Sequence, residues 1–388
     1  MRRAVLPVLA VVVLAVPAVL VVLSPAAAVA TVAPGSPPGW TSFRGDPQQT
    51  GRAAGELPAD PQPLWTFKAG AAISSTAAIV DGTVFVGSLD EHLYALDLAS
   101  GTLRWKHKAA GAIKSSPAVK DGVVYFGDSA GTFHALDAKT GKVRWTFTAD
   151  GEIVASAAFA AGCVLVGSYD QTLSCLEERS GKVRWRLETD GYLHGTPAVV
   201  TTPAGETVVS AGCDGFLRLV RARDGKELRR VALGGYVAAS PAVAGGRVFA
   251  GTFENQVVAV DLESGQVAWR YENPVRKFPY YASAAVAEGL VVVGGRDQTV
   301  RALDAASGKE IWSQGTRGAV DASPVIAGQR VVTASKSGAM FSLDLKSGRQ
   351  VWRFEAGAPV EASPALAAGR LVIGTMDGTL YCLGAKGR

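Results

Sequence analysis

The stretch Leu93-Tyr94-Ala95-Leu96-Asp97, followed by Ser100-Gly101 and Trp105, decides the fold, because close copies of it recur along the chain. Aligned on the glycine, the copies follow one another in steps of 40, 40, 44, 40, 43 and 40 residues. The aligned glycines are Gly101, Gly141, Gly181, Gly225, Gly265, Gly308 and Gly348. A nearly constant period of this length is typical of a repeat array or a closed ring.

Three repeat positions agree on the number of units. The aspartate position is filled by Asp97, Asp137, Glu177, Arg221, Asp261, Asp304, Asp344 and Gly384. Seven of the eight tryptophans share another position, namely Trp65, Trp105, Trp145, Trp185, Trp269, Trp312 and Trp352, with Arg229 in the remaining copy. A column of small residues, such as Ser115-Ser116-Pro117, also recurs eight times. We therefore expect eight units.

Each unit reads as four short strands separated by turn signals such as Asp121-Gly122 and Thr140-Gly141, which suit meander hairpins. Such small sheets need cover on both faces, and radial stacking supplies it. The sequence thus predicts an all-β protein, an eight-bladed β-propeller of four-stranded antiparallel blades. The chain opens with a Trp strand, Leu64 to Lys68, and ends on Leu380 to Leu383, so we expect the N-terminal strand to complete the last blade and close the ring.

The N-terminus predicts export. Residues 1–30 combine a basic start, an apolar run and Ala28-Val29-Ala30, the three parts of a signal peptide. The apolar run also has the length of a membrane span, so a retained anchor stays open as the alternative, and it is the only expected membrane contact. Residues 31–60 read as a Pro/Gly-rich linker and residues 61–388 as the propeller. The predicted location is periplasmic or otherwise extracytoplasmic.

The motif A-x-D-x-x-S/T-G-x-x-x-W resembles the tryptophan-docking motif of the pyrroloquinoline quinone (PQQ) type of eight-bladed propellers. Trp40, Phe43 and Arg44-Gly45-Asp46 likewise resemble the W-x-x-F-R-G-D leader that precedes many of them. The resemblance implies the propeller fold over the repeats. It leaves two functions open, because the family includes both quinoprotein alcohol dehydrogenases and the outer-membrane assembly lipoprotein BamB.

Signatures of chemistry are absent from the sequence: it has no H-E-x-x-H, no C-x-x-C and no phosphate-binding loop. The net charge of +5 is too small for a nucleic-acid footprint. We expect no catalytic residue, no metal and no cofactor, with PQQ as the alternative. Acidic residues recur between the second and third strands, as at Asp90 and Asp170, and read as turn formers rather than cation ligands. Cys175 and Cys382 read as buried spacers, and a Cys163–Cys175 disulfide is left open.

Residues just before the first strand differ from unit to unit where their neighbours barely vary. This column comprises Ile73, Lys114, Val154, His194, Ala238, Tyr281, Asp321 and Glu361. In a propeller these positions lie at the mouth of the central channel, and mixed polar groups in a concavity are the default binding-site hypothesis. Ordinary solvated loop residues are the alternative interpretation.

The 43-residue step inserts aromatic and basic residues beside this column, a combination that often forms binding hot spots. The predicted ligand or partner site comprises Lys114, His194, Arg276, Phe278, Tyr280, Tyr281, Asp321 and Glu361. We predict an exported, non-enzymatic binding or scaffold module that engages envelope proteins or a small ligand. A PQQ-dependent dehydrogenase using calcium at the channel mouth is the alternative.

Overall fold

The computed structural model describes residues 39–386 together with Met1. The predicted signal segment, apart from Met1, and the first part of the predicted linker lie outside the described residues. Residues 39–386 belong to one compact unit. Within residues 39–386, no helix is both long and apolar enough to cross a membrane.

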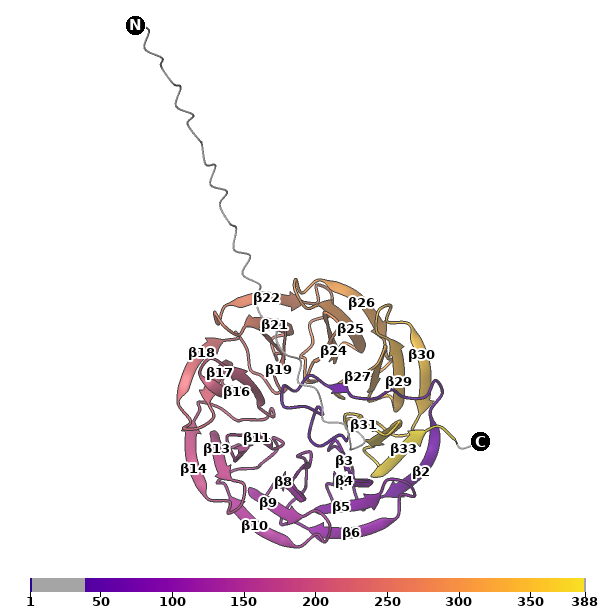
Figure 1. Cartoon of the computed structure of the whole chain (residues 1–388). Helices are drawn as coiled ribbons and strands as arrows, with labels where there is room; N and C mark the ends of the chain where they lie inside the picture. Colours follow the sequence, from indigo (N-terminus) through magenta and orange to yellow (C-terminus); the bar gives the residue numbers. More distant parts are fainter. Residues whose placement is uncertain (2–38, 387–388) are drawn as a thin grey trace. The chain divides into compact units, whose positions relative to one another are not determined.

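Eight sheets of four antiparallel strands surround a central channel, as the repeat predicts (Figure 1). The innermost strands are β3 (Ala78–Val80), β7 (Ala118–Lys120), β11 (Ala158–Ala160), β15 (Ala198–Thr202), β19 (Ala242–Ala244), β23 (Ala285–Ala287), β27 (Val325–Ala327) and β31 (Ala365–Ala367). The second strands are β4 (Thr83–Gly87), β8 (Val123–Gly127), β12 (Cys163–Gly167), β16 (Gly205–Ala211), β20 (Arg247–Gly251), β24 (Leu290–Gly295), β28 (Arg330–Ala334) and β32 (Arg370–Gly374).

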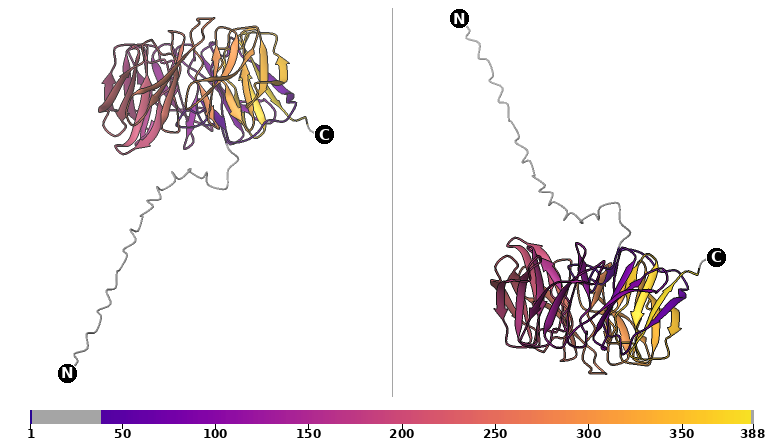
Figure 2. Two further views of the ribbon diagram at one scale, coloured as in Figure 1. Left: turned by 90° about the horizontal axis from the view of Figure 1, so that it is seen from above. Right: turned by 90° about the horizontal axis from the view of Figure 1, so that it is seen from below.

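The third strands are β5 (His92–Asp97), β9 (Thr132–Asp137), β13 (Thr172–Glu177), β17 (Phe216–Arg221), β21 (Gln256–Asp261), β25 (Thr299–Asp304), β29 (Ala339–Asp344) and β33 (Thr379–Gly384). The outer strands are β6 (Leu103–Lys108), β10 (Val143–Thr148), β14 (Val183–Glu188), β18 (Glu227–Ala232), β22 (Val267–Glu272), β26 (Glu310–Gly315), β30 (Gln350–Glu355) and β2 (Gln62–Lys68). We number the blades 1 to 8 in the order β3–β6, β7–β10 and so on. In side view the strands stand side by side around the ring (Figure 2).

Burial follows from the stacking of blades. The second strand of blade 1, Thr-Val-Phe-Val-Gly, is buried at every residue, because neighbouring blades cover both of its faces. The outer strand β6 alternates between exposed and half-buried residues, as a strand with one wet face should. The apolar core therefore lies between blades, in one cluster after another around the ring.

The ring closes as predicted. Strand β2 pairs antiparallel with β33, with Trp65 opposite Cys382 and Lys68 opposite Thr379. The first strand of the repeat region thus supplies the outer strand of blade 8. Without this pairing, β33 would expose a free edge.

Tryptophans on the outer strands join most blades to the next. The indole Nε1 of Trp65 donates to the carbonyl oxygen of Leu98 at 2.9 Å, and that of Trp105 donates to Ala138 at 3.1 Å. A Cβ atom at Gly101, where φ is +74°, would lie 2.6 Å from the Trp65 ring, so this position requires glycine. In blade 4, Arg229 lies against the equivalent Gly265, and its buried Nη1 has no hydrogen-bond partner among residues 39–386.

The second half of the predicted linker is not a spacer. Residues 40–53, which we call the strap, run across the ring and pair with innermost strands (Figure 1). The strap exchanges backbone bonds with Ile79 and accepts bonds from the N–H groups of Val119, Val199, Val243, Val286 and Ile326, in six blades altogether. Its last residues form β1 (Arg52–Ala53), which pairs parallel with β27.

Arg44 anchors the strap inside the ring. Its side chain is 1% exposed, and Nη2 donates to the carbonyl oxygens of Ala284 at 3.0 Å and Pro324 at 2.6 Å. Burial lowers the pKa of Arg44 to about 9, against the opposing effect of Asp46, so the guanidinium stays charged at neutral pH. Gly51 is required beside it, because a Cβ atom there would lie 1.9 Å from Arg44 Nη2.

Two of the four cysteines are joined. A disulfide links Cys163 on β12 to Cys175 on β13, with the Cα atoms 5.4 Å apart, a normal separation for such a bond. This resolves the pairing that the sequence left open. Cys382 is buried and has a free thiol, and Cys213 is also free.

Candidate functional site at the channel mouth

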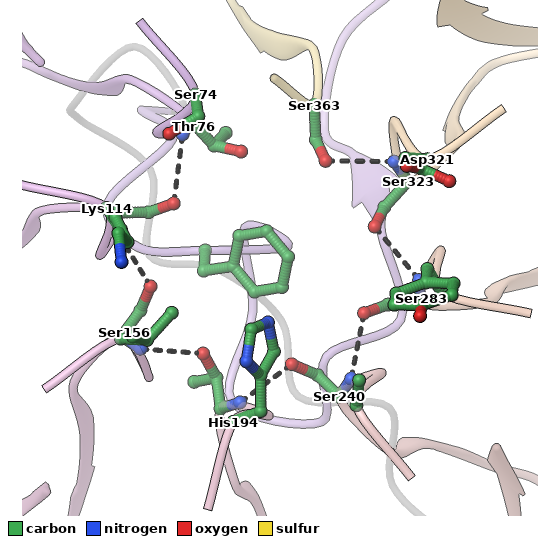
Figure 3. A pocket seen from close by; sticks show the side chains of 16 residues that line it. Ser74, Thr76, Lys114, Ser156, His194, Ser240, Ser283, Asp321, Ser323 and Ser363 are labelled. Carbon is green, nitrogen blue, oxygen red and sulfur yellow. Dashed lines mark hydrogen bonds between the residues drawn. The ribbon is translucent and has the colours of Figure 1, made fainter. Parts of the chain in front are cut away.

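A ring of hydroxyl groups lines the channel (Figure 3). The backbone N–H groups of seven of the eight members donate to the side-chain oxygen of the equivalent residue in the next blade, at 2.8–3.1 Å. The members are Thr76, Ser116, Ser156, Thr196, Ser240, Ser283, Ser323 and Ser363. This arrangement explains why the repeat requires a small hydroxyl residue here.

A cavity of about 160 Å³ occupies the channel inside this ring. Phe43 of the strap lines it, as do four predicted site residues: Lys114, His194, Tyr281 and Asp321. The structure therefore brings together these members of the variable column. Ile73 was misaligned by one residue, since it is fully buried and Ser74 occupies the blade 1 position.

A second variable column, which the sequence analysis missed, lies beside the first. Its residues lie in the turn between the second and third strands of each blade. This turn is bonded to the segment that precedes the next blade: Tyr169 N donates to Glu152 O and Cys213 N donates to Tyr192 O, both at 2.9 Å. Its members are Leu89, Ser129, Tyr169, Cys213, Phe253, Arg296, Lys336 and Met376. The signal was present in the sequence, because these residues also differ while their neighbours repeat.

Aromatic side chains gather where blades 3 and 4 meet. The hydroxyl of Tyr169 is 2.6 Å from His194 Nδ1, and the rings of Tyr169 and Tyr192 stack with centroids 4.8 Å apart. Burial lowers the pKa of His194, and the positive charge of Lys114 lowers it further. The imidazole is therefore neutral at pH 7 and able to accept or donate a hydrogen bond.

Aromatic and charged groups meet where blades 5 to 7 adjoin. The Arg296 guanidinium lies 3.5 Å from the centroid of Tyr281, whose ring also contacts Phe253 at 4.5 Å. Arg296 donates two hydrogen bonds to Asp321, of 2.9 and 2.8 Å. Such bidentate pairs hold both side chains in a fixed orientation.

The charged side chains at the channel mouth are paired in salt bridges. Lys336 bridges Asp321 at 3.0 Å and Glu361 at 2.8 Å, which connects the predicted residue Glu361 to this group. Lys114 pairs with Glu152 at 2.9 Å. Burial alone would raise the pKa of Asp321, but the hydrogen bonds from Arg296 and Lys336 outweigh it and hold that pKa below its usual value. Asp321 is thus a charged and fully engaged carboxylate.

The predicted site residues of the inserted loop differ in burial. Phe278 is 47% exposed, and Arg276 Nη1 donates to the carbonyl of Asp297 at 3.0 Å. Tyr280, in contrast, is 2% exposed and accepts a hydrogen bond from Arg301 at 3.0 Å, so it packs between blades. Arg276, Phe278 and Tyr280 do not line the cavity.

The recurring acidic residues satisfy local backbone groups. Asp90 Oδ1 accepts from the N–H of His92 at 3.0 Å, and Asp214 Oδ1 accepts from the N–H of Phe216 at 3.1 Å. In the described part of the chain, no three His, Cys, Asp or Glu side chains are grouped so that they could hold a metal ion.

The family model described as outer membrane protein assembly factor BamB matches residues 54–157, 148–212, 170–297 and 296–388, which together cover most of the chain. The chain belongs to this family. No curated protein sequence matches it.

Solved structures show the same fold at low identity. BamB from Moraxella catarrhalis is 17% identical with a TM-score of 0.71, covering 84% of this chain and 100% of that one. A quinohemoprotein alcohol dehydrogenase from Comamonas testosteroni is 14% identical with a TM-score of 0.76, over 90% of this chain and 81% of that one. A computationally designed protein, Ika8, is 21% identical with a TM-score of 0.70, over 84% and 100%. This chain thus shares its fold with a quinohemoprotein alcohol dehydrogenase and with a designed protein.

Proposed function

We propose that this protein is an exported binding or scaffold module of the cell envelope that engages a partner through its channel mouth. The observation that carries the proposal is the concentration of unlike side chains in two adjacent columns around one opening, on a ring that otherwise repeats. Function in repeat folds resides in such grafted sites. Membership of the BamB family supports an envelope location and a protein partner.

The exposed aromatics give the mouth the character of an interaction surface. Tyr192 is 49% exposed and Tyr236 is 59% exposed, and both follow a glycine at the same repeat position. Phe278 of the inserted loop adds a third large ring. Tyrosine and arginine near the centre of an interface are the usual carriers of binding energy.

The alternative, a PQQ-dependent dehydrogenase, fits the residues poorly. A quinone held by calcium needs free carboxylates, but Asp321, the only carboxylate among residues 39–386 that lines the cavity, is paired with Arg296 and Lys336. The cavity of about 160 Å³ is also smaller than the roughly 300 Å³ at which pockets for drug-sized ligands begin. We therefore derive no catalytic step through a quinone.

Capture from an envelope fraction tests the proposal. The double variant Tyr281→Ala/Phe278→Ala should weaken binding of the captured partner by roughly a hundredfold or more, since each of the two anchors contributes about 2 kcal/mol. Leu103→Ala, which truncates a 48% exposed side chain on the outer rim, is the matched control and should bind normally. Normal binding by the double variant, or equal loss in the control, contradicts a mouth-centred site.

Thermal unfolding of the same variants separates binding from folding. We expect the double variant to unfold near the wild-type temperature, whereas a large drop would show that the loop is a structural plug. Dye-linked alcohol oxidation after addition of PQQ and calcium would instead support the dehydrogenase.

A further inference from the structure

Seven hydroxyl protons of the channel ring have no acceptor among residues 39–386. The oxygens of Ser116, Ser156, Thr196, Ser240, Ser283, Ser323 and Ser363 each accept a backbone N–H from the preceding blade. None of them donates a hydrogen bond within the described part. All seven side chains are more than nine-tenths buried, and all line the cavity. A buried donor without a partner has an uncompensated desolvation cost, so we expect an occupant of the cavity to supply acceptor oxygens to this ring.

The charges around the cavity favour an uncharged occupant. Lys114 and Asp321 are the charged residues that line it, and each is already in a salt bridge, with Glu152 and with Arg296 and Lys336 respectively. His194 is neutral at pH 7 because burial lowers its pKa. An anion in the cavity would meet no unpaired cation that could offset its desolvation cost. Neutral hydroxyl or carbonyl oxygens have a smaller desolvation cost on entering the cavity.

The aromatic residues and the volume of the cavity restrict the class of ligand further. Phe43 lines the cavity from the strap and Tyr281 lines it from the mouth, so apolar faces accompany the polar ring. The volume of about 160 Å³ far exceeds the about 10–15 Å³ that one water needs, yet it falls short of a site for a large cofactor. A compact molecule with C–H faces and several peripheral oxygens matches this combination.

We propose that the channel cavity binds one uncharged cyclic polyol, such as a single pyranose unit, with its oxygens accepting from the hydroxyl ring. The inference extends the proposed function, because the cavity opens at the mouth, and it gives that site a ligand class. A free sugar and the terminal sugar of a glycan offer the same chemistry.

Calorimetric titration of the full-length protein with glucose, N-acetylglucosamine and myo-inositol tests the proposal, with inorganic phosphate as the charged probe. We expect saturable binding of at least one uncharged probe and none of phosphate. Saturable binding of phosphate alone would overturn the proposal in favour of an anion site. Binding of none of these probes, either free or as the terminal unit of a glycan polymer, would overturn it as well.

Two variants locate the site. Ala238→His fills the cavity at a repeat position where blade 4 already carries His194, so the fold should accept it, and it should weaken sugar binding at least tenfold. Ala268→His places the same side chain on the exposed rim and should change nothing. Ser240→Ala removes one donor and should weaken binding about three- to tenfold. Equal affinity in wild type and Ala238→His would contradict the proposed place.

Partner capture keeps this inference separate from the proposed function. If no sugar binds but the Tyr281→Ala/Phe278→Ala variant still loses its partner, only the polyol site fails. If sugar binds and partner capture is unaffected by the mouth variants, only the partner proposal fails. Binding of a glycan-terminated polymer but of no free sugar would identify the terminal unit as the source.

Discussion

At the strap end of the channel the contacts are made by backbone atoms and one buried guanidinium, whereas at the mouth they are made by side chains that differ from blade to blade. The strap satisfies N–H groups of the same repeat position in six of the eight blades, so its partners do not depend on side-chain identity. The mouth is built from two columns of unlike residues joined by partly exposed salt bridges. The difference indicates that one end of the channel stabilises the ring, and it motivates our proposal that the other end binds a partner.

The largest effect should come from removing the strap. Deleting residues 39–53 would leave six backbone hydrogen-bond positions and the buried Trp40 site exposed, at a cost on the order of 5 kcal/mol. Urea unfolding should show this loss, while deleting residues 31–38 as a control should leave stability unchanged. The comparison between the two ends breaks down if both deletions are harmless.

A single methyl group should disturb the strap nearly as clearly. Gly51→Ala would place a Cβ atom 1.9 Å from Arg44 Nη2 at a position where φ is +65°, so we expect a loss of about 2–3 kcal/mol. Gly55→Ala is the matched control, because nothing lies within 4 Å of its added Cβ. Thermal or urea unfolding measures both, and a stability of Gly51→Ala equal to that of the control would disprove the tight packing of Arg44.

An arginine at the mouth should matter much less for stability. Arg296→Met removes a pair with Asp321 that is about one-third exposed on the arginine side, together with its contact to Tyr281, and should cost about 1 kcal/mol or less. Arg144→Met, on the outer rim, provides the baseline for losing an exposed pair. A loss of stability larger than that of Gly51→Ala would contradict the proposal that the strap, rather than the mouth, stabilises the ring.

The smallest effect concerns pH. The pKa of Asp321 is lower in the folded protein than in the unfolded chain. Its ionisation therefore stabilises the fold fully above about pH 4, and this stabilisation is lost as the pH falls further. The stability difference between wild type and Asp321→Asn should therefore be constant from pH 7 to pH 5 and shrink below pH 4. Unfolding at these pH values measures it, and a difference that grows on acidification would show that the sign is wrong.

Local patterns were sufficient for the fold and for grouping four of the eight predicted site residues around one cavity. The column containing Lys114, His194, Tyr281 and Asp321 was found because the repeat made its variation visible, and these residues do line one cavity. Tyr280 could not be placed, because whether an inserted aromatic faces solvent or packs between blades depends on Arg301, on another strand. The second column was overlooked, although Tyr169 and Arg296 hold His194 and Asp321 in place.

The sequence by itself determined the number of blades, the strand order and the closure of the ring, because each unit repeats its turn glycines, small residues and tryptophan at a constant period. Only the tertiary structure decided the role of residues 40–53. Their composition reads as a linker, since a strap whose bonds are made by its backbone needs no periodic side chains. The free donors of the hydroxyl ring were also hidden in the sequence, because they arise only when eight distant residues converge on one axis.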